Sequence, residues 1–266
     1  MRIAIVGGGN MGEAMLKGLF KKKLSTKQEI TVVELLSPRR ELLRRRYGIP
    51  VTDDSRSAIN DVGVVILAVK PKDLTGVMEL VSPLLKNQLV ISIVAGYSLE
   101  AIRRKLKYEN VVRAMPNTPA QIGKGMTAWT ETASLSKEHH AMAQEVLSAL
   151  GEEHYFKDEE YIDMATAVSG SGPAYVYLFI EALTDAGVHI GLPRNVAEKL
   201  VMETIIGSAE AMQKMSKHPA EMKNIVTSPG GTTTDALLQL ESGGLRSMMI
   251  NAVTAAYQKA KTIGIK

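Results

Sequence analysis

The sequence predicts a two-part protein, with an α/β domain built on a doubly wound parallel sheet followed by a domain made only of helices. In the first part, short apolar runs that end in glycine or proline alternate with helical patterns, as in βαβ units. After about residue 160 the strand-like runs stop, and long amphipathic or apolar helical patterns take their place. We therefore expect one domain over residues 1–160 and a second over residues 161–266.

Apolar runs mark the expected strands of the parallel sheet. The run "RIAIV" goes directly into glycines, and "VGVVILAVKP" and "QLVISIVAG" stop at Pro71 and Gly96. Short, continuous apolar runs of this kind are typical of strands that are buried on both faces. The main strands are expected at residues 2–6, 30–35, 62–71, 88–96 and 110–119, with two further strands near residues 124–131 and 152–156.

The second half of the chain predicts helices that one small domain cannot easily bury. Residues 174–188, "AYVYLFIEALTDAGV", are almost wholly apolar, so we expect this helix to be buried on all sides. Burial of such a helix within roughly 105 residues is difficult, which predicts that a partner chain covers part of this domain. Further helices are expected at residues 194–215, 234–244 and 245–264.

The composition excludes several classes of function. The 266 residues carry a formal net charge of only +4 and 5% aromatic residues, so no nucleic-acid partner is expected. The chain has no cysteine, and its five histidines lack zinc-binding spacing, so no metal site is expected. No apolar run approaches the roughly 18 residues of a membrane span, and no signal peptide is recognisable. We expect a soluble, cytoplasmic protein.

A glycine-rich loop joins the first expected strand to a helical pattern, "MGEAMLKGLF". The loop consists of Gly7, Gly8, Gly9, Asn10, Met11 and Gly12, and it fits the pattern G-x-G-x-x-G. Its place between a strand and a helix is the context that a dinucleotide-binding Rossmann domain requires. In that setting Gly7 permits a tight turn, Gly9 lets the backbone approach the pyrophosphate, and Gly12 lets helix and strand pack closely. A plain tight turn is the alternative, and this context does not favour it.

The residues after the second expected strand leave the choice between NAD and NADP open. Glu34 follows Gly12 by 22 residues, where an acidic residue usually binds the ribose hydroxyls of NAD. Ser37, Arg39 and Arg40 come soon afterwards, where a 2′-phosphate of NADP would lie. We narrowly favour the phosphate interpretation, so NADPH is the expected cofactor and NADH the alternative.

The carboxyl ends of the third and fourth main strands are expected to line the same crevice, as in other doubly wound sheets. Ala68, Val69, Lys70 and Pro71 should therefore pass the ribose of the nicotinamide. Lys70 has two interpretations, either as a catalytic group or as a structural residue beside the cofactor.

Three later segments are more polar and glycine-rich than packing requires. They are "RAMPNTPA" (113–120), "VSGSGPAYVYLFIEAL" (168–183) and "TSPGGTTTDALLQLESGG" (227–244). Together with "GGGNMG" and "AVKP", and in matching order and spacing, they closely resemble the pyrroline-5-carboxylate reductase family over essentially the whole chain. The resemblance implies a Rossmann domain that carries NAD(P)H. It also implies a helical domain that interlocks with its twin, in dimers that often assemble into rings of five.

The same resemblance implies the residues of the site. The cofactor would contact Gly7 to Gly12, Ser37, Ser55, Ala68 to Lys70, Ala95 and Gly96. The substrate would meet the turn at residues 228–233, with Thr233 as the hydrogen-bond donor near the ring nitrogen. The family often has a non-acidic residue near position 34, so Glu34 puts the preference for NADP in question.

The chemistry of the implied reaction agrees with the residues of this turn. The substrate is a five-membered cyclic imine with a carboxylate, so the site must orient it and supply a weak proton source. A turn that opens a helix can hold a carboxylate through backbone N–H groups and hydroxyls. The residues that provide these groups are Ser228, Gly230, Gly231, Thr232 and Thr233. A pure helix cap without a ligand is the alternative interpretation.

The expected activity is the reduction of L-1-pyrroline-5-carboxylate to L-proline by hydride transfer, the last step of proline biosynthesis. A reductase of another cyclic imine carboxylate would keep the same motifs, and so would a non-catalytic regulatory paralogue that binds nucleotide. The glycine-rich start of the helix at Gly172 is followed by Val176, where related dehydrogenases of β-hydroxy acids have a catalytic lysine. Valine cannot accept a hydroxyl proton, so oxidation of an alcohol is disfavoured.

Overall fold

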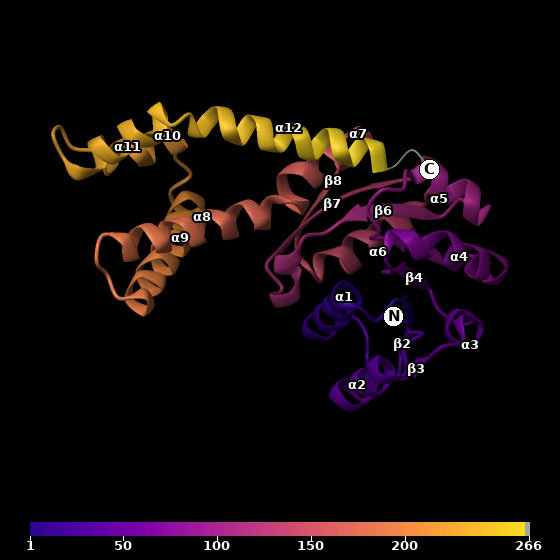
Figure 1. The fold of residues 1–266 in the computed structure, drawn as a ribbon. Coiled ribbons are helices and arrows are strands. Elements are labelled where there is room, and N and C mark those ends of the chain that lie inside the picture. Colours follow the sequence, from indigo (N-terminus) through magenta and orange to yellow (C-terminus); the bar gives the residue numbers. More distant parts are fainter. Residues whose placement is uncertain (264–266) are drawn as a thin grey trace. The chain divides into compact units, whose positions relative to one another are not determined.

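The computed structural model describes residues 1–263, which form two compact units. The first unit contains Met1–Ser171 and the part of the C-terminal helix that begins at Ala256, and the second contains Gly172–Ala255. Figure 1 shows the sheet of the first unit and the helices of the second. No helix within residues 1–263 is long and apolar enough to cross a membrane.

The described part of the first unit is built on one eight-stranded sheet, with the order β3-β2-β1-β4-β5-β6-β7-β8. All neighbouring strands are parallel except the pair β6–β7, which is antiparallel. The doubly wound parallel sheet predicted from the alternating apolar runs is confirmed. The strands are β1 (Ile3–Val6), β2 (Ile30–Val33), β3 (Val51–Thr52), β4 (Val64–Leu67), β5 (Leu89–Ser92), β6 (Val111–Met115), β7 (Gly125–Glu131) and β8 (Gly151–Tyr155).

Helices cover both faces of this sheet, and each face has its own apolar core (Figure 1). Ile3 and Ile5 of β1 belong to one core, whereas Ala4 and Val6 belong to the other. Side chains of a strand alternate between its two faces, so one continuous apolar run supplies both cores. The first core includes α1 (Asn10–Lys21), α2 (Ser37–Tyr47) and α6 (Lys137–Ser148), and the second includes α3 (Ser55–Ile59), α4 (Pro71–Val81) and α5 (Leu99–Leu106).

Several strands are shorter than the apolar runs that predict them, and one is not predicted at all. β4 ends at Leu67, because the chain then turns into α4, whose first residue is Pro71. The sequence does not predict β3, since two residues are too few to show a pattern. It also does not predict the antiparallel direction of β7, which depends on how the connection crosses the sheet edge.

The second unit is helical throughout, as expected. Its helices are α8 (Gly172–His189), α9 (Arg194–Met215), α10 (Pro219–Ile225), α11 (Thr232–Ser242) and most of α12 (Leu245–Ile263). The sequence does not predict α10, whose two turns are too short for an apolar period. The last expected helix reaches residue 264, which lies outside the described residues.

Burial of α8 on all sides, expected from its apolar sequence, is wrong for the single chain. Thr184 is the one residue of this helix that is buried. α9 packs against α8, but the unit has too few other elements to cover the remaining face. The exposed large apolar side chains of α8 are Val176, Tyr177, Leu178, Phe179 and Leu183.

The first unit extends past the domain boundary at residue 160 that we expect from the sequence. Arg113 of β6 is buried, and its guanidinium binds Glu159 and Asp163, each at 2.5 Å. These ion pairs join the sheet to α7 (Glu160–Ala165). The hydroxyl of Tyr257 donates to Glu160 at 2.9 Å, so the end of α12 also belongs to this unit. Contacts between residues distant in sequence therefore move the division to Ser171.

Candidate functional site

The glycine-rich loop lies between β1 and α1, and three of its glycines differ in what surrounds them. Gly7 has a φ of +112°, and a Cβ atom there would lie 2.5 Å from the carbonyl oxygen of Ala68. A Cβ atom at Gly12 would lie 2.0 Å from the carbonyl oxygen of Gly7. Around Gly9, by contrast, no atom lies within 4 Å of an added Cβ. Packing of the chain thus explains the glycines at positions 7 and 12, and a ligand would explain the one at position 9.

Two of the predicted cofactor residues hold the peptide groups of Gly8. The carboxylate of Glu34 accepts a hydrogen bond from the Gly8 N–H at 3.1 Å and another from the Leu36 N–H at 2.9 Å. Arg39 donates from Nε to the Gly8 carbonyl at 2.6 Å. Glu34 therefore lies beside the loop, where a ribose would bind, but both of its oxygens already accept hydrogen bonds.

Glu13 holds Arg39 in place, a role that no pattern in the sequence indicates. Its carboxylate binds Arg39 at 2.5 Å and Arg46 at 2.8 Å, and it accepts a hydrogen bond from the Tyr47 hydroxyl. Burial opposes ionisation, but hydrogen bonds from Tyr47, Arg39 and Arg46 outweigh it and lower the pKa of Glu13 to about 2. An acidic residue in the first turn of a helix is too common to reveal this contact from sequence.

Ionisation of Glu13 predicts a dependence of stability on pH. Because the pKa is lower in the folded chain, the ionised carboxylate stabilises the fold above about pH 4.5, and this stabilisation is lost as pH falls towards 2. Glu13→Gln should remove this part of the acid transition and lower the free energy of unfolding at pH 7 by about 3 kcal/mol. Urea unfolding between pH 2.5 and 7 measures both effects.

Glu41→Gln is the matched control for this prediction, since Glu41 lies exposed on α2. We expect its unfolding curve to follow the wild type over the whole pH range. Equal acid transitions in the wild type and Glu13→Gln would contradict the role given to Glu13.

The other predicted cofactor residues lie where parallel strands end. Ala68 and Val69 contact the glycine loop beside Gly7. Lys70 is exposed and caps α4, and Pro71 is the first residue of that helix. The remaining ones each follow a strand of the same parallel set: Ser37 begins α2, Ser55 begins α3, and Ala95 and Gly96 follow β5. The structure thus brings these residues to one edge of the sheet, as the doubly wound fold predicts.

The predicted substrate turn lies in the second unit, at the start of α11. The Gly231 N–H donates to the Ser228 carbonyl at 3.0 Å, and Gly230 has a φ of +67°. The hydroxyl of Thr234 also donates to the Ser228 carbonyl, at 2.7 Å. Thr234 therefore stabilises the turn, although the sequence analysis does not single it out.

Thr232 and Thr233 have a different setting from Thr234. The N-terminal cap of α11 is Gly231, and no side chain accepts a hydrogen bond there. Within residues 1–263 the hydroxyls of Thr232 and Thr233 have no hydrogen-bond partner. A pure capping role for either hydroxyl, the alternative interpretation of this turn, therefore finds no support in the contacts.

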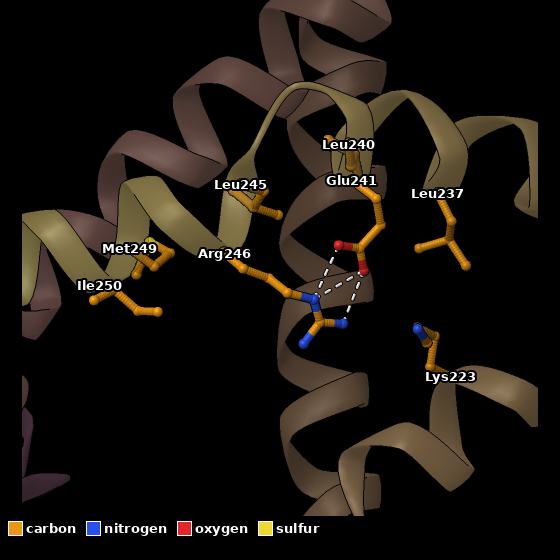
Figure 2. Close-up of a pocket in the computed structure, with 8 residues that line it drawn as sticks. All are labelled: Lys223, Leu237, Leu240, Glu241, Leu245, Arg246, Met249 and Ile250. Atoms are coloured by element: carbon orange, nitrogen blue, oxygen red, sulfur yellow. Dashed lines mark hydrogen bonds and ion pairs between the residues drawn. The ribbon is translucent and has the colours of Figure 1, made fainter.

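A hollow of about 530 Å³ lies elsewhere in the second unit, between α10, α11 and α12 (Figure 2). It does not include the turn at residues 228–233. Inside it Arg246 and Glu241 pair through hydrogen bonds of 2.8 to 3.0 Å, so Arg246 is not free to bind a substrate carboxylate. The other lining residues are Lys223, Leu237, Leu240, Leu245, Met249 and Ile250. This hollow has the character of an apolar contact surface.

Comparison with protein families agrees with both halves of the site. A family described as "NADP oxidoreductase coenzyme F420-dependent" matches residues 2–96, which contain the glycine loop and the strand ends. A second family, "Pyrroline-5-carboxylate reductase dimerisation", matches residues 159–263. The loop and its surroundings thus belong to an NADP-dependent oxidoreductase.

Relatives of known name cover the whole chain. A pyrroline-5-carboxylate reductase from Synechocystis is 43% identical over 266 residues, which cover 100% of this chain and 99% of the relative. The chain belongs to the pyrroline-5-carboxylate reductase family.

Solved structures of the family have the same fold. A pyrroline-5-carboxylate reductase from Coxiella burnetii has a TM-score of 0.92 and 33% identity, and the match covers 100% of this chain and 99% of that one. A pyrroline carboxylate reductase from Plasmodium falciparum, solved with NADP bound, has a TM-score of 0.90 and 30% identity, with 99% and 98% covered. The resemblance stated from the sequence motifs, the fold class and the expected use of NADPH are confirmed.

Proposed function

We propose that the chain reduces L-1-pyrroline-5-carboxylate to L-proline with NADPH, as the last step of proline biosynthesis. Full-length similarity to reductases of this name supports the activity. The main observation in favour of a cofactor site is the open space at Gly9. Packing explains the other two glycines of the motif, Gly7 and Gly12, but not Gly9. Gly9 is the N-terminal cap of α1, where glycine is favoured, and a ligand that approaches the backbone closely would give position 9 a stronger reason to be glycine.

The reaction requires orientation more than strong acid catalysis. NADPH transfers a hydride to the carbon of the C=N bond, and the nitrogen ends as an amine after it has gained a proton. A hydrogen bond donated to the imine nitrogen polarises the C=N bond for hydride attack, so correct placement of the two rings and of that donor supplies much of the rate enhancement. Hydrogen-bond donors that face the carboxylate and the nitrogen are the groups the protein must add.

The cofactor residues follow from the edge of the sheet. We place the pyrophosphate at the N-terminus of α1, against Gly7 to Gly12, where backbone N–H groups and the helix dipole favour an anion. The adenosine ribose and its 2′-phosphate would lie beside Glu34, Ser37 and Arg39, with Ser55 nearby. The nicotinamide half would pass Ala68 to Pro71 and Ala95 to Gly96.

Arg39 supports NADPH as the preferred cofactor, whereas the carboxylate of Glu34 beside it favours NADH. Arg39 is held at the loop by Gly8 and Glu13 through Nε and Nη2, which leaves Nη1, without a partner within residues 1–263, to donate to a phosphate. The oxygens of Glu34 accept hydrogen bonds from backbone N–H groups, which reduces their capacity to bind ribose hydroxyls. NADH remains the alternative cofactor.

We assign the substrate carboxylate to the turn at the start of α11. Ser228, Gly230 and Gly231 form the turn, and the N–H groups of the first helical residues point out of the helix end. Thr232 and Thr233 add two hydroxyls that have no hydrogen-bond partner within residues 1–263. Thr233 is the proposed donor to the ring nitrogen and thus the candidate catalytic residue.

The initial rate of NADPH and NADH oxidation with pyrroline-5-carboxylate tests the function. We expect rapid, saturable turnover, with a higher kcat/KM for NADPH than for NADH. Turnover only with a six-membered cyclic imine would identify a related reductase instead. Nucleotide binding without turnover of any imine would identify a regulatory paralogue. Fractionation of cells that express the protein checks the expected cytoplasmic location.

The dimerisation family over residues 159–263 supports self-association of the chain. We propose a homodimer formed through the C-terminal helices, with a decamer as a further stage of assembly. The exposed apolar face of α8 and the apolar hollow lined by Leu237, Leu240 and Met249 support this surface. Their burial against a second copy would remove apolar area from water, which is the main driving force of association.

Leu178→Glu is expected to convert the oligomer into a monomer, because it places a charge in the proposed apolar interface. Light scattering coupled to size exclusion measures the mass. Leu80→Glu is the matched control, since Leu80 of α4 and Leu178 of α8 are 64% and 65% exposed in the single chain. An oligomer that survives Leu178→Glu would exclude α8 from the interface.

A further inference from the structure

Asn117 lies in the segment at residues 113–120, which the proposed function does not use. It follows β6, which ends at Met115. β6 is parallel to β5, and β5 is parallel to β4. The carboxyl ends of parallel strands share one edge of a sheet, so Asn117 lies at the same edge as the proposed cofactor residues that follow β4 and β5.

Both ends of the Asn117 side-chain amide bind groups far away in the sequence. Its Oδ1 accepts a hydrogen bond from the Met126 N–H at 2.9 Å. Its Nδ2 donates to the Ser169 carbonyl at 3.3 Å and to the Ser169 hydroxyl at 3.2 Å. Because a backbone N–H can only donate, the bond to Met126 settles which end of the amide is oxygen. Asn117 thus joins the end of β6 to β7 and to the segment around Ser169.

Ser169 belongs to a π-helical turn, Thr166–Gly170, which is an uncommon local structure. The Ser171 N–H donates to the Thr166 carbonyl at 2.8 Å, five residues back in the chain. Single π-helical turns occur mostly inside α-helices, and they are frequent at functional sites. An ordinary α-helix would run through this point without the extra residue, so something must hold the turn in its wider form.

The π-helical turn approaches the end of β6 at a second place. A Cβ atom at Gly170 would lie 3.1 Å from the terminal methyl carbon of Met115. Val168, at the centre of the turn, is 63% exposed although it is apolar. Asn117 therefore joins the turn to the end of β6, Gly170 lets the turn approach Met115 closely, and Val168 is left uncovered in the single chain.

We propose that Asn117 is a positioning residue, which holds the π-helical turn 166–170 against the carboxyl end of β6 so that the turn forms a wall of the crevice for hydride transfer. Such a wall excludes water and aligns the nicotinamide with the imine. This inference rests on the proposed function, since that function places the nicotinamide at this edge. Asn117 itself need not touch either ring.

Asn117→Asp tests the link between Asn117 and the Ser169 carbonyl. The variant keeps the size of the side chain and the oxygen that accepts from the Met126 N–H, but it replaces the donor to Ser169 by a second oxygen, which repels the Ser169 carbonyl and can only accept from the Ser169 hydroxyl. Asn110→Asp is the matched control, because Asn110 precedes the same strand at its opposite end and donates to the Tyr108 hydroxyl at 3.4 Å. Both variants add the same charge.

The measurements are kcat, KM for pyrroline-5-carboxylate, the Kd of NADPH, and the isotope effect on kcat with NADPH deuterated at the transferred position. For Asn117→Asp we expect kcat to fall by about tenfold or more, with an increased isotope effect and a Kd of NADPH within about twofold of wild type. Asn110→Asp should match the wild type. A merely structural role would lower thermal stability without increasing the isotope effect.

Three results would overturn the inference. The first is a folded Asn117→Asp enzyme with wild-type kcat and isotope effect. The second is weaker NADPH binding at unchanged kcat, which would assign Asn117 to the cofactor site. The third is a wild-type enzyme without turnover, which would also overturn the proposed function, whereas the first two leave that function intact.

Asn117→Ala decides the matter if Asn117→Asp does not fold. It removes the hydrogen bonds to Ser169 and to Met126 without placing a charge beside them. We expect the same lower kcat and larger isotope effect. Wild-type kinetics in a folded Asn117→Ala enzyme would show that the link to the turn does not affect hydride transfer.

Discussion

Thr233→Ala is expected to lower kcat/KM for pyrroline-5-carboxylate by about 30- to 100-fold, with less than about a twofold change in NADPH affinity. Thr233 lies in the first turn of α11, and its hydroxyl has no hydrogen-bond partner within residues 1–263. Its removal thus costs the folded chain no internal hydrogen bond. The loss must then come from the substrate, and a hydrogen bond to a charged group contributes about 1.5–3 kcal/mol. Steady-state kinetics and a fluorescence titration with NADPH measure the two effects.

Two further threonine variants sharpen this prediction. Thr233→Ser keeps the hydroxyl and should restore most of the activity. Thr234→Ala removes the hydrogen bond to the Ser228 carbonyl, so it should loosen the turn and lower the melting temperature together with activity. An unchanged kcat/KM in Thr233→Ala would exclude Thr233 from the mechanism. A loss that Thr233→Ser does not restore would assign the effect to packing.

Gly12→Ala is expected to weaken NADPH binding by more than about 100-fold and to lower the free energy of unfolding by about 3 kcal/mol or more. The new Cβ atom would lie 2.0 Å from the carbonyl oxygen of Gly7, so β1 and α1 must move apart. Both atoms belong to the backbone and cannot rotate away as a flexible side chain would. The loop that we propose faces the pyrophosphate then loses its shape, and equilibrium dialysis with NADPH would detect the loss.

Gly9→Ala separates the effect of the ligand from that of the fold. An added Cβ atom at Gly9 meets no atom of residues 1–263 within 4 Å, so the free energy of unfolding should change by less than about 1 kcal/mol. The Kd of NADPH should nevertheless rise by about tenfold or more if the pyrophosphate approaches this backbone. Wild-type NADPH binding in Gly9→Ala would move the pyrophosphate away from the loop.

Much of the fold could be predicted from local patterns in the sequence. The apolar runs at residues 2–6 and 88–96 fit β1 and β5, and the pattern at residues 194–215 coincides with α9. The helical second half and the glycine loop could also be predicted, because each depends on residues that are neighbours along the chain. β3 and α10 could not be predicted, since they are too short to show a pattern and form only through packing against neighbouring elements.

The candidate site, too, could be predicted only in part from the sequence. The residues named from the glycine motif and the strand ends do lie at one edge of the sheet, because the order of parallel strands follows from βαβ connections. No pattern indicates that Glu13 holds Arg39, that Thr234 stabilises the turn at Ser228, or that Asn117 reaches Ser169. Each of these contacts depends on the direction of a side chain in the folded chain.

By itself the sequence determined the class of the fold, the place of the glycine-rich loop between the first strand and the first helix, and the family of the protein. These depend on periodicity and on motifs, which a few adjacent residues can carry. Only the tertiary structure decided which side chains hold the loop and the turn, and it left the apolar face of α8 uncovered in the single chain. Hydrogen bonds and burial join residues that are tens of positions apart, and their geometry exists only once the chain has folded.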